Sequence, residues 1–226
     1  ESYGGIRAAG VAYHLQDRYG MNLNGVILLS SLLDFRTLRS GAGDDLTNSV
    51  YLPGFTAVAH YHKRIKGDRD KLVAEAKEFA FGEYASALLL GNDLSTQRRK
   101  AIAERLSELT SLPAALFLEN DLRLSPSRFR KELLRHKNIV VGRFDGRVAW
   151  PTQNRSSDFA DYDPSYSVVY GAFSTAMLDY LTRDLGWKED NPYEILTGKV
   201  QPWDYGAQNS YVNVTGRLVA AMRQNP

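Results

Sequence analysis

Two adjacent apolar patterns near the start of the chain constrain its fold more than any other feature. Residues 6–18 carry apolar side chains on most sides of a helical projection, and Gly20 follows at the position of a helix C-terminal cap. The next run, Asn24 to Ser31 (NGVILLSS), is short, continuous and apolar, which is typical of a buried strand in a parallel sheet. A buried helix followed by a buried strand predicts the second half of a strand-helix-strand unit.

Beyond Asp34 the helical period dominates. A polar, Gly-rich loop at 39–49 is followed by amphipathic patterns, and 138–142 (NIVVG) is only weakly strand-like. We expect helices with Pro53 in a first turn, over 72–80, after the cap Ser95, after Ser125-Pro126, around 173–181 and over 210–224. The sequence therefore predicts a mostly helical chain with a partial parallel sheet.

The composition excludes several classes of function. With 226 residues and 43% apolar content, the chain can form one sizeable domain or one core with a large insertion. Its 28 Lys and Arg nearly balance 26 Asp and Glu, and no basic run alternates with aromatic residues, so we do not expect nucleic acid as a partner. No apolar stretch of about 18 residues would span a membrane. The absence of cysteine excludes disulfides, thiolate metal ligands and a cysteine nucleophile.

The first five residues, ESYGG, match most of the Gly-x-Ser-x-Gly turn that presents a nucleophilic serine between a strand and a helix. Glu1-Ser2-Tyr3-Gly4 supplies every position except the first glycine. Gly4 and Gly5 would allow the helix to pack closely behind such a turn. The same letters also fit a serine that merely caps a helix N-terminus, and the local sequence leaves both interpretations open.

Five motifs in order resemble the bacterial branch of the serine carboxypeptidase family over nearly the whole chain: ESYGG, NLNGVILLSSLLD, YLPGFTAVAHYH, GRFDGR and DYDPSY. The resemblance implies an α/β-hydrolase fragment with a predominantly α-helical cap and a partial parallel-sheet core. It implies three segments: residues 1–34 as partial core, 35–203 as the helical cap insertion, and 204–226 as a helix returning to the core. The catalytic Asp and His of such enzymes would lie beyond residue 226.

The resemblance also implies a function, namely hydrolysis of C-terminal peptide bonds through an acyl-enzyme on Ser2. The backbone N–H of Tyr3 would donate to the oxyanion, and Glu1 would bind the terminal carboxylate of a peptide substrate through a shared proton. The resemblance implies no cofactor and no metal. It does imply export to the periplasm or out of the cell. An esterase or acyltransferase on the same scaffold, or a non-catalytic helical module, are the alternatives.

The four histidines do not suggest a metal site or a base for Ser2. His60 and His62 are two residues apart on an expected helix, whereas helical metal pairs are usually four apart. His14 is expected on a buried helix as a hydrogen-bonded core residue, and His136 suits a helix C-terminus.

Two polar motifs are candidates for either a substrate cleft or a purely structural role. In GRFDGR, Arg143, Asp145 and Arg147 alternate, and we favour a buried ion pair that holds two cap segments together over a pocket wall. The acidic and aromatic run 158–166 is either a cleft border or an ordered surface loop.

The apolar run 24–31 would need neighbours on both sides. This chain alone would expose it as a sheet edge. We therefore expect self-association, or pairing with the core segments that the resemblance places outside the chain.

Overall fold

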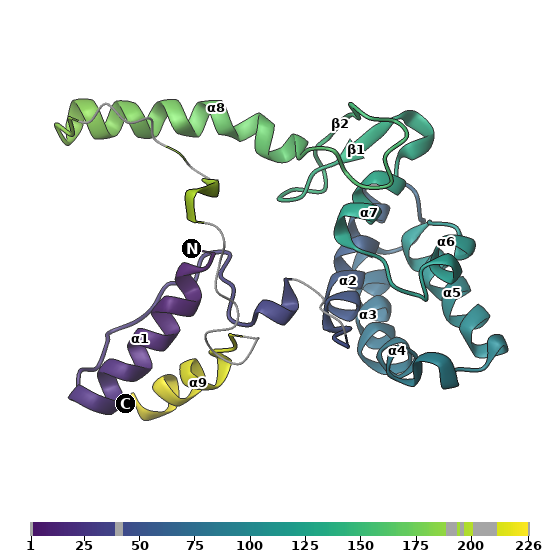
Figure 1. The fold of residues 1–226 in the computed structure, drawn as a ribbon, viewed down its shortest axis with the longest axis horizontal. Helices are drawn as coiled ribbons and strands as arrows, with labels where there is room; N and C mark the ends of the chain where they lie inside the picture. Colours follow the sequence, from purple (N-terminus) through teal and green to yellow (C-terminus); the bar gives the residue numbers. More distant parts are fainter. Residues whose placement is uncertain (1, 39–42, 189–193, 195–196, 201–211, 226) are drawn as a thin grey trace. The chain divides into compact units, whose positions relative to one another are not determined.

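The structure is a computed structural model, and it describes residues 2–38, 43–188, 194, 197–200 and 212–225. The chain divides into two compact units, one formed by Glu1–Thr47 with Gln201–Pro226 and the other by Asn48–Val200 (Figure 1). None of the described helices is long and apolar enough to cross a membrane. The segment boundaries expected at residues 34 and 203 stay predictions.

The first unit is built on helix α1 (Gly4–Tyr19), which lies against helix α9 (Thr215–Gln224). α1 ends where the sequence predicts, because Gly20 adopts a φ of 62° and its N–H bonds back to the carbonyls of Leu15 and Gln16. The buried residues of α1 are Gly5, Ile6, Ala9 and Ala12. Only one stripe of this helix is covered, although its apolar side chains extend further round.

Main-chain hydrogen bonds join the two ends of the chain within this unit. The N–H of Phe35 donates to the carbonyl of Val212 at 3.2 Å, and the N–H of Val214 donates to the carbonyl of Leu33 at 2.9 Å. Between these bonds, the Asn213 side-chain amide donates to Asp34 at 2.7 Å. The isolated bridge between Asp34 and Asn213 thereby places α9 beside α1.

The expected parallel sheet is not present among the described residues, and the prediction of an α/β-hydrolase core is wrong for them. Residues 24–31 form no strand and are exposed except at Ser31, with Ile27 95% exposed. The described part of the chain contains one sheet, in which β1 (Ile139–Val141) pairs antiparallel with β2 (Ala149–Pro151). A continuous apolar run becomes a buried strand only when neighbouring strands supply main-chain partners and layers cover both faces. Here α1 and α9 cover one side.

Helices and short helical turns build the second unit. They are α2 (Leu46–Tyr61), α3 (Arg69–Phe79), a π-helical turn (Ala80–Tyr84), α4 (Ala85–Leu90), a 3-10 turn (Gly91–Asp93), α5 (Thr96–Thr110), α6 (Ala114–Glu119), α7 (Pro126–Glu132), a 3-10 turn (Arg135–Lys137), α8 (Pro164–Asp179), a π-helical turn (Tyr180–Asp184) and a 3-10 turn (Gly198–Val200). α2 to α7 enclose one apolar core (Figure 1). Phe55 of α2 stacks on Phe129 of α7 with ring centroids 4.1 Å apart, and the Tyr84 hydroxyl donates to the carbonyl of Leu122 at 2.6 Å.

Capping serines set two helix starts in this unit, as the sequence predicts. The side chains of Ser95 and Ser125 accept the N–H of Arg98 and Arg128, at the starts of α5 and α7. The expectation for Pro53 is wrong, because α2 begins at Leu46 and Pro53 lies inside it. Burial of α2 in the core outweighs the hydrogen bond that a proline removes from a helix interior.

Gly5 allows the segment after α1 to return close to this helix. A Cβ at residue 5 would lie 2.5 Å from the Cβ of Ser31, which is shorter than any ordinary carbon contact. A Cβ at Gly4 would have nothing within 4 Å. Of the two glycines expected to serve close packing, Gly5 has that role and Gly4 does not.

We therefore predict opposite effects for two neighbouring glycine substitutions. Gly5→Ala should lower the free energy of unfolding by about 1–3 kcal/mol, because the 29–32 segment has to move. Gly4→Ala gains helix propensity without a clash and should raise the free energy of unfolding by up to about 1 kcal/mol. Urea denaturation followed by far-UV circular dichroism measures both, and equal effects would contradict the close approach.

Candidate active site

Ser2 occupies a strained turn immediately before α1. Its φ is 50°, in the left-handed region that residues other than glycine rarely adopt. Tyr3 then has helical angles, and the helix proper begins at Gly4. A Gly-x-Ser-x-Gly elbow presents its nucleophilic serine on a sharp, strained turn between a strand and a helix. The described residues supply the strained turn and the helix that follows it.

Main-chain hydrogen bonds hold this turn on both sides. The N–H of Ser2 donates to the carbonyl of Leu29 at 3.3 Å, and the carbonyl of Ser2 accepts the N–H of Leu32 at 3.1 Å and that of Gly5 at 3.0 Å. The backbone of Ser2 is therefore fixed, while its side chain is exposed. The sequence did not indicate that the main chain of Leu29 and Leu32 would hold Ser2, because main-chain hydrogen bonds do not depend on residue type.

The capping interpretation of Ser2 does not match the structure. The N-cap residue of α1 is Tyr3, and it makes no side-chain capping bond. Ser95 and Ser125 illustrate the alternative, since each has an extended N-cap conformation and accepts an N–H three residues later. The Ser2 hydroxyl makes no hydrogen bond with any described residue.

The main chain of Tyr3 lies at the N-terminus of α1, and its side chain packs near Phe35 of the same unit. Its ring centroid lies 6.3 Å from that of Phe35, and the Arg7 guanidinium lies 5.9 Å from the Tyr3 centroid. The positive end of the helix dipole at this point favours an anion, and the first turn carries no acidic side chain. Glu1, the expected carboxylate-binding residue, lies outside the described residues.

No histidine of the first unit reaches Ser2. His14 follows Ser2 by twelve residues along α1, which is about 18 Å of helix rise, and its ring lies edge-on to that of Tyr19 with centroids 5.6 Å apart. In the second unit, His60 and His62 bond through Nε2 to the carbonyls of Gly67 and Gly146, at 3.0 and 2.7 Å. Within the described ranges no three His, Asp or Glu side chains converge as metal ligands.

The GRFDGR motif forms a turn docked on α2. Gly146 lies so close to this helix that a Cβ there would be 2.5 Å from Val58 Cγ2. Asp145 and Arg147 form a double hydrogen bond within the turn, with the shortest N···O distance 2.7 Å. Hydrogen bonds from the Arg147 side chain and N–H lower the pKa of Asp145 to about 2. This ion pair is exposed and local, so it does not join two segments as we expected.

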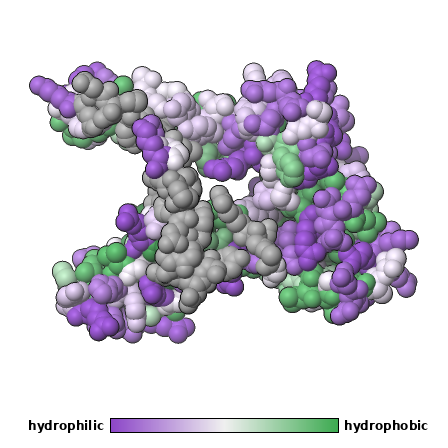
Figure 2. Space-filling view, viewed as in Figure 1, coloured by the Kyte–Doolittle hydropathy of each residue, from purple (hydrophilic) through white to green (hydrophobic). Residues whose placement is uncertain are grey.

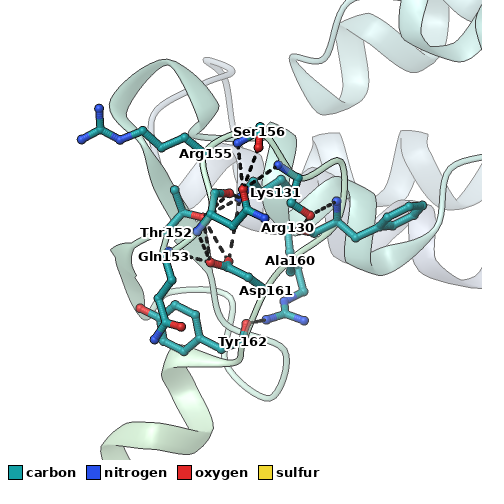
Figure 3. Close-up of polar contacts among 12 residues, drawn as sticks. Arg130, Lys131, Thr152, Gln153, Arg155, Ser156, Ala160, Asp161 and Tyr162 are labelled. Atoms are coloured by element: carbon teal, nitrogen blue, oxygen red, sulfur yellow. Dashed lines mark hydrogen bonds and ion pairs between the residues drawn. The ribbon is translucent and has the colours of Figure 1, made fainter.

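The run 158–166 is tied to α7 through a buried lysine. Lys131 is only 2% exposed, and its Nζ donates to Thr152 Oγ1 at 2.5 Å and to the carbonyl of Asn154 (Figure 3). Asp161 accepts the N–H groups of Gln153 and Asn154 at 2.5 and 2.7 Å and lies 3.8 Å from Lys131 Nζ. Partial burial acts to raise the pKa of Asp161, but these N–H groups and the Thr152 hydroxyl hold it below its usual value.

A second carboxylate in the same run is also engaged by the main chain. Asp163 Oδ1 accepts the N–H of Arg143 at 2.8 Å and the hydroxyl of Ser165 at 2.6 Å. Arg130, whose side chain donates to the carbonyls of Val141 and Tyr162, lies 3.8 Å from Asp163. Both carboxylates thus order the loop rather than project from it toward a ligand.

Lys131 should contribute far more to stability than an exposed lysine nearby. Lys131→Met removes the donor to Thr152 and Asn154 and leaves Asp161 without its cation, so we expect the free energy of unfolding to fall by about 1–3 kcal/mol. Lys137→Met, at an exposed position on the same basic stretch, should change it by less than about 0.5 kcal/mol. Chemical denaturation of both variants measures the difference, and similar values would contradict the anchoring role of Lys131.

Comparison with protein-family models, with curated proteins and with solved structures gives no match to this chain. The family resemblance therefore rests on the sequence motifs themselves, and any activity is a proposal.

Proposed function

We propose that Ser2 is the nucleophile of a serine carboxypeptidase-type hydrolase that releases residues from the C-terminus of peptides. The observation that carries the proposal is the backbone of Ser2, with a φ of 50° directly before α1. The exposed hydroxyl, which has no hydrogen-bond partner among the described residues, supports it. The five motifs, in the order that resembles the serine carboxypeptidase family, support peptides with a free C-terminus as the class of substrate.

In this chemistry Ser2 Oγ attacks the carbonyl carbon of the last peptide bond while a base accepts the hydroxyl proton. The oxyanion that forms is stabilised by the N–H of Tyr3 and by the N-terminal end of α1. The C–N bond then breaks, the leaving amine takes the proton, and the acyl group stays on Ser2 as an ester. Water hydrolyses this ester and restores the serine. The base is histidine in the best-studied serine hydrolases.

Glu1 is the residue next to the nucleophile that would select a free C-terminus. A carboxyl group binds a carboxylate only if the two share a proton. Binding through Glu1 therefore strengthens as the pH falls toward the pKa values of the pair. An amide or ester at the C-terminus lacks the second carboxylate and gains nothing from Glu1.

The first test is chemical labelling of Ser2. We expect a fluorophosphonate probe to add to the intact chain at Ser2, and added imidazole to speed the reaction by supplying a base. The adduct should disappear in Ser2→Ala, as read by intact mass and peptide mapping. Ser95, an exposed serine at a helix N-terminus with ordinary angles, is the internal control and should stay unlabelled. No adduct at Ser2 with imidazole present, or equal labelling of Ser95, would overturn the proposal.

A second test separates a carboxypeptidase from an esterase. Glu1→Gln should reduce acylation of Ser2 by peptide substrates with a free C-terminus by at least about tenfold, equivalent to the roughly 1.4 kcal/mol of one charged hydrogen bond. Acylation by neutral esters should be nearly unchanged. Rates of Ser2 acylation for the two substrate classes provide the measurement, and equal losses would point to a general esterase.

A further inference from the structure

Residues 24–28 present a main chain without hydrogen-bond partners. No N–H or carbonyl of Gly25, Val26, Ile27 or Leu28 bonds to any described residue. On either side the chain is tied down, because the Leu23 carbonyl accepts the Asn225 amide at 2.8 Å and the Leu29 carbonyl accepts the N–H of Ser2. The free groups therefore lie on a stretch whose two ends are held in place.

This stretch is more extended than a helix. It returns alongside α1 from Met21, which bonds to Leu15, to Leu29, which bonds to Ser2 (Figure 1). The span from Ser2 to Leu15 rises about 20 Å at a helical 1.5 Å per residue, so the returning residues advance about 2.4 Å each, midway between the rise of a helix and that of a strand.

Side chains along the stretch alternate in exposure as they do in a strand. Val26 and Leu28 are 37% and 39% exposed and line a cavity of about 360 Å³ between α1 and α9. Ile27 and Leu29, on the other side, are 95% and 64% exposed. Hydrophobic residues accordingly show on the surface of this unit (Figure 2). The exposure of the stretch has the period-two pattern of a strand, and no strand of the described residues lies beside it.

Residues 21–33 carry none of the side chains that usually protect a strand edge. From residue 21 to residue 33 there is no charged residue and no proline. Natural edge strands carry lysine, proline or a bulge that prevents another strand from adding. Uncharged apolar segments of six or seven residues pair readily with identical segments, because no like charges are brought together.

We propose that residues 25–29 pair antiparallel with the same residues of a second copy of this chain, about a two-fold axis at Ile27. This register places Val26 opposite Leu28 of the second copy, so the less exposed side chains of both copies share one face. Ile27 lies opposite its own counterpart on the other face. The contact is isologous and closes at two copies.

The first measurement is the mass in solution. The wild-type chain should sediment as a dimer with twice the 25.3 kDa mass of one chain, and dissociate on dilution. Ile27→Lys places two like charges opposite each other at the axis and should weaken the dimer by at least about tenfold. Val168→Lys is the matched control, because Val168 is also apolar and is 67% exposed on α8. That variant should remain a dimer.

The register is tested by crosslinking, which is simple because the chain has no cysteine of its own. Ile27→Cys should form a disulfide between two copies on mild oxidation, since opposite residues in an antiparallel pair are about 4.5–5.5 Å apart. A mixture of Val26→Cys and Leu28→Cys should crosslink more than either alone. Val168→Cys should not crosslink.

Circular dichroism of each variant should match that of the wild type, which shows that the exposed substitution leaves the fold intact. A wild-type chain that stays monomeric at every concentration would overturn the proposal, whether the stretch is covered from within the chain or stays open. A dimer that survives Ile27→Lys would place the contact elsewhere and overturn it as well.

Discussion

The pairing of Leu33 to Phe35 with Val212 to Val214 is the interaction on which the first unit depends. Its main-chain bonds connect residues 177 and 181 positions apart, and the Asp34 carboxylate reinforces them by accepting the Asn213 amide. Arg36 pairs with the same carboxylate at 2.7 Å. Partial burial acts to raise the pKa of Asp34, and the hydrogen bonds and charge of Arg36 hold it below its usual value. Because this contact fixes where α9 starts, it decides which stripe of α1 is buried and which apolar residues stay exposed.

The turn at Ser2 and the exposed stretch 24–29 are parts of one arrangement. The same segment that returns along α1 supplies the carbonyl of Leu29 and the N–H of Leu32 that hold Ser2 in its strained conformation. Gly5 allows this approach, because any side chain there would collide with Ser31. A strained backbone persists only where its surroundings hold it. A partner strand that orders residues 25–29 would therefore also stiffen the turn that carries Ser2, although the two proposals stand on separate observations.

Several local features were predictable because they depend on neighbours in sequence. The cap at Gly20, the capping serines Ser95 and Ser125, and the periodic apolar faces of the helices all act over one or two turns. The strained turn fits the ESYGG motif for the same reason. Lys131 was not predictable, since a lysine in a basic stretch is normally solvated. Its burial follows from acceptors at Thr152 and Asn154, which only the folded loop brings to it.

The sequence by itself determined the C-terminal cap of α1, the capped starts of α5 and α7, and which serine follows the nucleophile pattern, because caps, glycines and apolar periods are local signals. The tertiary structure alone decided that NGVILLSS is exposed rather than a buried strand, because a strand exists only when another segment offers main-chain donors and acceptors beside it. It also decided that Asp161 and Asp163 order a loop. Hydrogen-bond partners far apart in sequence leave no mark on residue type, so their pairing is visible only in the fold.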